Sequence, residues 1–101
     1  MLTLLLEVNL AKFEAIEFEW DEGNLTEIEG HSVDYWECEE CFFNEHKVYR
    51  NKRSGRPYRT YRLIGRTDAG RKLNVIFFIH SRRRVETATT ALVRVITAWS
   101  L

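Results

Sequence analysis

A β-hairpin is the clearest structural signal in this sequence. Residues 59–67 and 72–79 are rich in β-branched and aromatic side chains, and Asp68-Ala69-Gly70 lies between them. Glycine supplies the left-handed backbone conformation that short hairpin loops require. Both faces of the second run are apolar, one with Leu73, Val75, Phe77 and Ile79 and the other with Ile76 and Phe78. The second strand is therefore predicted to be central in a sheet and covered on both sides.

The remaining segments predict further strands and two helices. Residues 13–20 alternate, with Ile16, Phe18 and Trp20 on one side, as in a half-buried strand. A short helix is predicted over 24–30 with Asn24 as its N-cap, and a second over 32–44 with Val33 and Trp36 on its buried stripe. A basic loop is predicted over 47–57 and a final strand over 91–99. The expected fold is α+β in the order β-α-α-β-β-β, an antiparallel sheet with two short helices packed on one face.

Length and composition favour one domain in a reducing compartment. The 101 residues fit a single domain over 1–101. The apolar runs are too short to span a bilayer, and no Lys or Arg precedes the first leucines as in a signal peptide. Two cysteines do not make a disulfide framework. We therefore expect a cytoplasmic protein with no membrane partner.

Charge is divided sharply between the two halves of the chain. Residues 1–45 carry thirteen Asp and Glu and one lysine, a sum of −12, whereas residues 46–101 carry fourteen Lys and Arg and two acidic residues, a sum of +12. This asymmetry indicates an anionic partner for the second half, nucleic acid above all. The alternative is that the two halves neutralise each other inside one fold.

The basic segment 47–62 has the composition of an RNA-binding surface. It reads KVYRNKRSGRPYRTYR, with tyrosines between the cations. Arginine binds phosphate bidentately and tyrosine stacks on bases, which suits single-stranded RNA, although a solvated basic loop is the alternative. The candidate RNA-binding residues are Arg50, Arg53, Arg56, Tyr58, Arg59, Arg71 and Lys72.

Two arginines of the predicted hairpin share one strand face. Arg62 and Arg66 lie on the same side as Ile64, about 13 Å apart at about 3.3 Å per residue. Arg94 on the final strand could join them. Arginines placed on a sheet are better candidates for a site than loop arginines.

The cysteines and histidines do not predict a metal or redox site. Cys38 and Cys41 form a CxxC pair without a second pair, and the glutamates beside them would raise the pKa of both thiols. Two core cysteines one helical turn apart are expected, with no metal and no cofactor. None of His31, His46 and His80 has the spacing of a metal site or a catalytic triad.

Several segments resemble the BrnT family of toxins. They are FEWDE at 18–22 with Asn24, His31-x-Val33, the hairpin YRLIGRTDAGRKLNVIF at 61–77 and VRVITA at 93–98. The resemblance spans about Phe18 to Trp99, so the chain divides into an N-terminal extension over 1–16 and a BrnT-like core over 17–99. It implies a compact α+β fold like the RelE and barnase-type ribonucleases. It also implies a cytoplasmic bacterial toxin that cleaves RNA without a metal ion and is silenced by a ribbon-helix-helix antitoxin.

RNA cleavage of this type uses the ribose 2′-OH as nucleophile on the adjacent phosphate, with a base, an acid and cations that stabilise the added negative charge. The resemblance implies His31, Arg62 and Arg66 as catalytic residues, and Arg94 is added as a fourth candidate from its strand. The chain departs from the family at Ser32, where the family has Gly, and at Trp99, where the family has Arg followed by a C-terminal helix. A weak or inactive relative that binds RNA or antitoxin is therefore the alternative to a ribonuclease.

The two ends of the chain predict self-association. Trp99 is expected to share a strand face with Val93 and Val95, either capping the core or exposed at the end of the sheet. The leucine-rich segment Met1–Ala15 is expected to cover this surface, in cis or from a second copy. We expect the second copy, and therefore a homodimer.

Overall fold

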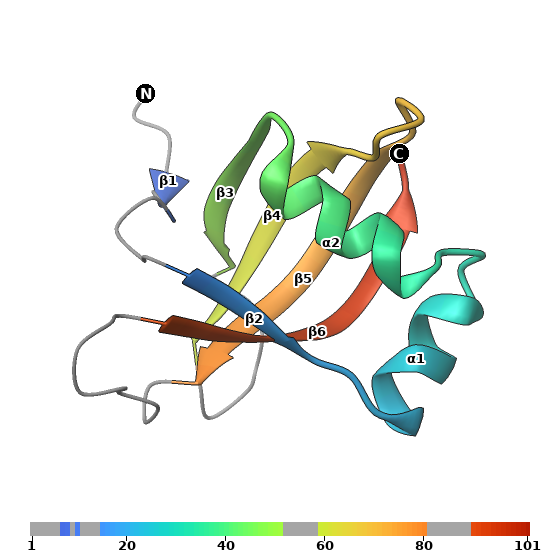
Figure 1. Ribbon diagram of the computed structural model, residues 1–101, viewed down its shortest axis with the longest axis horizontal. Helices are drawn as coiled ribbons and strands as arrows, with labels where there is room; N and C mark the ends of the chain where they lie inside the picture. Colours follow the sequence, from blue (N-terminus) through green and yellow to red (C-terminus); the bar gives the residue numbers. More distant parts are fainter. Residues whose placement is uncertain (1–6, 9, 11–14, 52–58, 81–89) are drawn as a thin grey trace.

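The computed structural model describes residues 7, 8, 10, 15–51, 59–80 and 90–101, which form a six-stranded sheet and two helices (Figure 1). The elements are β1 (Glu7–Val8), β2 (Ala15–Glu19), α1 (Glu22–Glu29), α2 (Tyr35–Phe43), β3 (His46–Asn51), β4 (Thr60–Arg66), β5 (Lys72–His80) and β6 (Thr90–Ser100). The strands lie in the order β1-β3-β4-β5-β6-β2. The α+β class is confirmed. The sheet contains two strands that were not predicted, β3 and the two-residue β1.

The sheet is mixed, not antiparallel throughout. β3, β4, β5 and β6 are antiparallel neighbours. β2, in contrast, runs parallel to β6, with Phe18 beside Val93. The antiparallel prediction is wrong at this edge because alternation of side chains identifies a strand but not its neighbour.

β3 occupies residues that were predicted as part of a basic loop. Val48 is 1% exposed and lies opposite Leu63, whereas Lys47 and Tyr49 project from the other side of the strand. The loop prediction is wrong for residues 47–51. Val48 is the one aliphatic residue of this strand, and the residues around it are polar, charged or aromatic, so the sequence does not show the apolar alternation that is typical of a strand. The remainder of the predicted loop, residues 52–58, lies outside the described residues.

The β4–β5 hairpin is confirmed. Leu63 lies opposite Val75, and Gly70 in the loop has a φ of 88°, as the sequence predicts for this position. β5 is central, between β4 and β6, and Leu73, Val75 and Phe77 are fully buried on one face. The prediction that both faces are covered is wrong for the other face at Ile76, which is half-buried; α2 lies on the opposite side of the sheet (Figure 1).

α1 begins earlier than predicted because Asp21, not Asn24, is its N-cap. The Asp21 side chain accepts a hydrogen bond from the Asn24 backbone N–H, and the Asp21 N–H donates to the Asn24 side chain in return. The Asn24 amide also donates to the carbonyls of Glu19 and Val95, at 2.9 and 3.0 Å. One buried side chain therefore joins the end of β2, the start of α1 and the middle of β6.

α2 packs across one face of the sheet (Figure 1). Phe42 contacts the rings of Phe18 and Phe77 edge to face, at centroid distances of 5.0 and 4.9 Å. The predicted burial of Trp36 is wrong: the helix begins at Tyr35 rather than Ser32, and Trp36 is 51% exposed. Gly65 allows the close packing of α2 on β4, because a Cβ there would lie 3.0 Å from the Cys41 carbonyl oxygen.

A β-bulge changes which way the end of β6 faces. Phe77 pairs with Val95 but Ile76 pairs with Thr97, so Ile96 is an extra residue in β6. Val93, Val95 and Ala98 are therefore buried on the α2 side, and Trp99 lies on the opposite face, 38% exposed. The prediction that Trp99 shares a face with Val93 and Val95 is wrong because a bulge shifts the alternation by one residue.

Part of the predicted N-terminal extension belongs to the sheet. Glu7 and Val8 pair with Tyr49 and Val48 of β3, and Leu10 is 5% exposed in the core. β1 is separated from β6 by three strands, so these residues do not cover the Trp99 surface of their own chain as predicted. Within the described ranges, no helix is long and apolar enough to cross a membrane.

Candidate nucleic-acid interface

Cations gather on the face of the sheet opposite α2, which we call the open face. Strand register places on it Lys47, Tyr49, Arg62, Ile64, Arg66, Lys72, Asn74, Ile76, Arg94 and Trp99. Arg62 and Arg66 flank Ile64 on β4, which confirms that they share a face. Lys72 pairs with Arg66 in register, and Lys47 pairs with Ile64. Three adjacent strands thus bring four cations to one surface.

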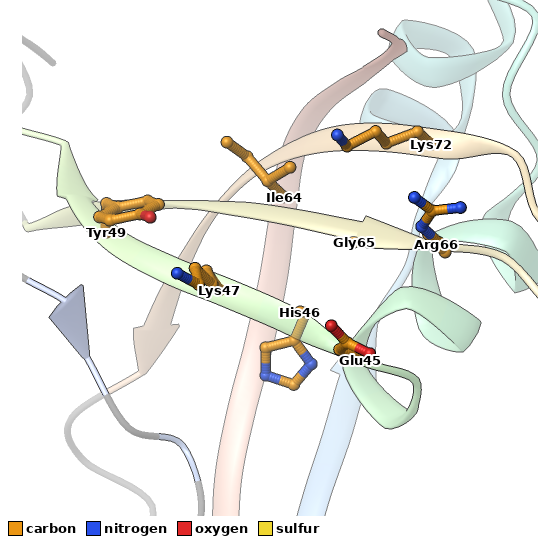
Figure 2. Close-up of a pocket in the computed structure, with 8 residues that line it drawn as sticks. All are labelled: Glu45, His46, Lys47, Tyr49, Ile64, Gly65, Arg66 and Lys72. Carbon is orange, nitrogen blue, oxygen red and sulfur yellow. The ribbon is translucent and has the colours of Figure 1, made fainter.

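A pocket of about 370 Å³ opens on this surface (Figure 2). Its lining residues come from β3, β4 and β5 and the turn before β3: Glu45, His46, Lys47, Tyr49, Ile64, Gly65, Arg66 and Lys72. Figure 2 shows His46 turned away from Arg66 and Lys72, and its Nδ1 lies 2.8 Å from the Asn44 carbonyl oxygen. The pocket therefore combines three cations, one carboxylate and one phenol.

Two arginines outside the pocket, Arg71 and Arg94, are neutralised by acidic residues of the first half of the chain. Arg94 binds Glu19 at 3.0 Å and Asp21 at 2.8 Å. Its hydrogen bond to Asp21 raises the pKa of Arg94, and the same bond lowers the pKa of Asp21. Arg71 donates to Glu37 at 3.0 Å and to the Ser32 carbonyl. These pairs support the neutralisation hypothesis for Arg71 and Arg94 and do not include Lys47, Arg62, Arg66 and Lys72.

The four candidate catalytic residues do not form one cluster. Arg66 lines the pocket, whereas Arg62 lies over the Tyr49 ring, 6.0 Å from its centroid. His31 is exposed beyond the end of α1, where its Nε2 lies 3.2 Å from Glu27 and its ring 6.4 Å from Trp99. Arg94 is held by its carboxylate partners. Arg66 is therefore the candidate that lines a pocket together with two further cations that no carboxylate of the described residues neutralises.

The candidate RNA-binding residues are distributed over several surfaces. Lys72 lines the pocket, and Arg59 is exposed immediately before β4. Arg50 pairs with Tyr61 on the α2 side of β3. Arg53, Arg56 and Tyr58 lie outside the described residues.

The two cysteines are buried, as predicted. Cys38 and Cys41 are 0% exposed on α2 and are not joined by a disulfide. Burial, together with nearby glutamates, raises the pKa of both thiols, that of Cys41 to about 12. Among the residues that the structure describes, no group of three or more His, Cys, Asp or Glu side chains could hold a metal ion.

The sequence placed Lys47 and Tyr49 in an RNA-binding segment, but it did not identify Glu45 or the strand β3 that brings the three together. Glu45, Lys47 and Tyr49 alternate with the buried Val48, which is a strand pattern on a short scale. That pattern is visible in the sequence only once residues 45–51 are interpreted as a strand instead of a loop.

Comparisons with known proteins identify no relative. No protein-family model matches the chain, and searches of curated proteins and of solved structures find no significant match.

Proposed function

We propose that this protein binds single-stranded RNA on its open face and cleaves it without a metal ion, as a toxin of the BrnT type. The observation that carries this proposal is the set of cations Lys47, Arg62, Arg66 and Lys72. Among the described residues, no carboxylate lies within 4.0 Å of these four, whereas Arg71 and Arg94 are paired. Unpaired cations on adjacent strands suit a phosphate backbone, and Tyr49 beside them suits stacking on a base.

A catalytically weak or inactive relative that binds RNA or an antitoxin is the second candidate. It is favoured by the contacts of two candidate catalytic side chains with carboxylates of the same chain. His31 lies beside Glu27, and Arg94 binds Glu19 and Asp21. Incubating the purified protein with bulk RNA, with and without EDTA, separates the two. Cleavage in both samples supports the ribonuclease, binding without cleavage supports the second candidate, and neither binding nor cleavage contradicts both.

Salt should weaken RNA binding steeply. Each cation that contacts a phosphate releases counterions, with a slope of about −0.7 in log K against log salt concentration per contact on a single strand. The four unpaired cations of the open face therefore contribute a slope of about −3. The double variant Lys47→Gln/Lys72→Gln should make the slope shallower by about 1.4. Fluorescence anisotropy with a labelled oligoribonucleotide measures both values, and binding that is flat between low and moderate salt would contradict the proposal.

The proposed partners are a ribbon-helix-helix antitoxin and a second copy of the chain. Deleting residues 1–12 removes β1 from the β3 edge of the sheet and Leu10 from the core. We expect the deletion to convert a dimer to a monomer, because this segment is the proposed contact between the copies, or to aggregates, because the exposed β3 edge invites association. Light scattering gives the mass in solution, and an unchanged mass with an unchanged melting temperature would reject a covering role for this segment.

A further inference from the structure

Three side chains of different chemistry lie in one row across the sheet. Arg66 pairs with Lys72 on β5, and His46 pairs with Gly65, which places Glu45 beside Arg66 on the other side. Adjacent strands are about 4.8 Å apart, so the row places the backbone positions of Glu45 and Lys72 roughly 10 Å apart with Arg66 between them. Figure 2 shows Glu45 and Arg66 at the same end of the pocket, with Lys72 on the neighbouring strand. The order across the row is carboxylate, guanidinium, ammonium.

We infer that this row is the catalytic apparatus, with Glu45 as the base, Arg66 as the phosphate ligand and Lys72 as the acid. The inference rests on the proposed function and assigns the roles within it. Displacement at phosphorus requires the attacking and the leaving oxygen on opposite sides of the phosphorus atom. A phosphate bound to Arg66 has a proton acceptor on one side and a proton donor on the other, which is the arrangement that an in-line displacement needs.

The reaction consists of two proton transfers and the exchange of one bond at phosphorus. Glu45 takes the proton of the ribose 2′-OH, and the 2′-oxygen forms a bond to phosphorus. The bond from phosphorus to the 5′-oxygen breaks, and Lys72 gives that oxygen a proton. The products are a 2′,3′-cyclic phosphate and a free 5′-OH, and the guanidinium of Arg66 stabilises the charge that builds up on the phosphate oxygens.

Other candidate bases are less well placed. His46 lines the pocket but turns away from Arg66 and Lys72 (Figure 2). His31 is held beside Glu27 and beside Trp99 of β6, a strand that does not line the pocket. Glu45 is exposed and, among the described residues, forms no ion pair within 4.0 Å, so its carboxylate is open to a substrate hydroxyl. Because the nucleophile is a 2′-OH, the substrate class is RNA and not DNA.

A change of leaving atom separates the two proton-transfer roles. The substrates are 2′-O-methyl oligonucleotides that each contain one of the four ribonucleotides, with either oxygen or sulfur at the bridging 5′ position. A thiolate leaves without protonation, so sulfur removes the need for the acid but not for the base. Lys72→Met should lower the rate on the oxygen substrate by roughly 10²-fold and change the sulfur rate by only a few fold. Glu45→Gln should lower both rates by roughly 10²-fold.

The controls keep binding and folding apart from catalysis. Glu29→Gln, at an exposed position of α1, should leave both rates unchanged. The affinity of Glu45→Gln for the fully 2′-O-methyl oligonucleotide should equal that of the wild type or exceed it, since a negative charge is removed. Wild-type rates in Glu45→Gln, or equal losses on both substrates in Lys72→Met, would contradict the catalytic roles assigned to the row. Either result would leave the ribonuclease proposal intact. If the wild-type protein binds but cleaves neither substrate, the catalytic roles are contradicted and an RNA-binding protein remains. Absence of binding contradicts the proposed function itself.

Discussion

Arg66→Ala should lower the rate of RNA cleavage by roughly 10²-fold to 10³-fold without lowering the melting temperature. Arg66 lines the pocket beside Lys47 and Lys72, where a guanidinium can stabilise charge that develops on a phosphate. Removing one such preorganised donor raises the barrier of the chemical step, because water cannot replace it at the same position. Arg66 is exposed, and its side chain forms no ion pair with the described residues, so the fold should tolerate the change. Single-turnover rates at saturating protein measure the effect.

Arg62→Ala is the matched variant on the same strand face. Arg62 lies over the Tyr49 ring and not in the pocket lining, so its loss should weaken binding more than it slows the chemical step. Arg53→Ala should likewise act mainly on binding. The sequence alone predicted equal roles for Arg62 and Arg66, and the structure separates them. Equal and small effects from all three variants would remove any special role for Arg66.

Asn24→Ala should lower the free energy of unfolding by about 3 kcal/mol. The Asn24 side chain is 3% exposed and contributes to the helix cap and to two further hydrogen bonds, with the carbonyls of Glu19 and Val95. Alanine leaves those two carbonyls without their donor in a region where water is excluded, which costs more than the loss of an exposed bond. For a domain of this size we expect the melting temperature to fall by roughly 10 °C or more.

Asn44→Ala is the control for Asn24→Ala. The Asn44 amide also makes two hydrogen bonds, with the Arg66 carbonyl and with Asp68, but both are exposed. Water can replace them, so the free energy of unfolding should change by less than about 1 kcal/mol. Thermal and urea denaturation compare the two variants. Similar losses in both would show that burial does not set the cost at Asn24.

Local patterns predicted both helices and four of the six strands that the structure describes, and pairing between distant segments was not predictable from them. The β4–β5 hairpin was identified because its two strands and its Gly70 loop are adjacent in sequence. The partnership of β2 with β6 was missed, since no local feature of residues 15–19 encodes a parallel neighbour about 75 positions later. The orientation of Trp99 was missed because the bulge at Ile96 is a property of the pair β5–β6 and not of either strand alone.

The candidate site was predictable in part for the same reason. Arg66 and Lys72 belong to the hairpin and were both singled out in the sequence. Glu45 stands at the end of an acidic, largely helical stretch, where a carboxylate is typical of a solvated surface. Its place beside Arg66 depends on the register of β3 against β4, which the sequence did not indicate.

The pairing of β2 with β6 also determines when the molecule can fold. β2 is the terminal strand of the sheet, so Phe18 and its neighbours gain their strand partner only after residues 90–94 have been synthesised. α1 depends on the same late strand, because Asn24 donates to Val95. Contacts between such distant segments slow folding, since the loop between them must close before the contacts are gained. During synthesis, β2 and α1 of the acidic first half therefore gain these contacts only when β6 of the basic second half is available.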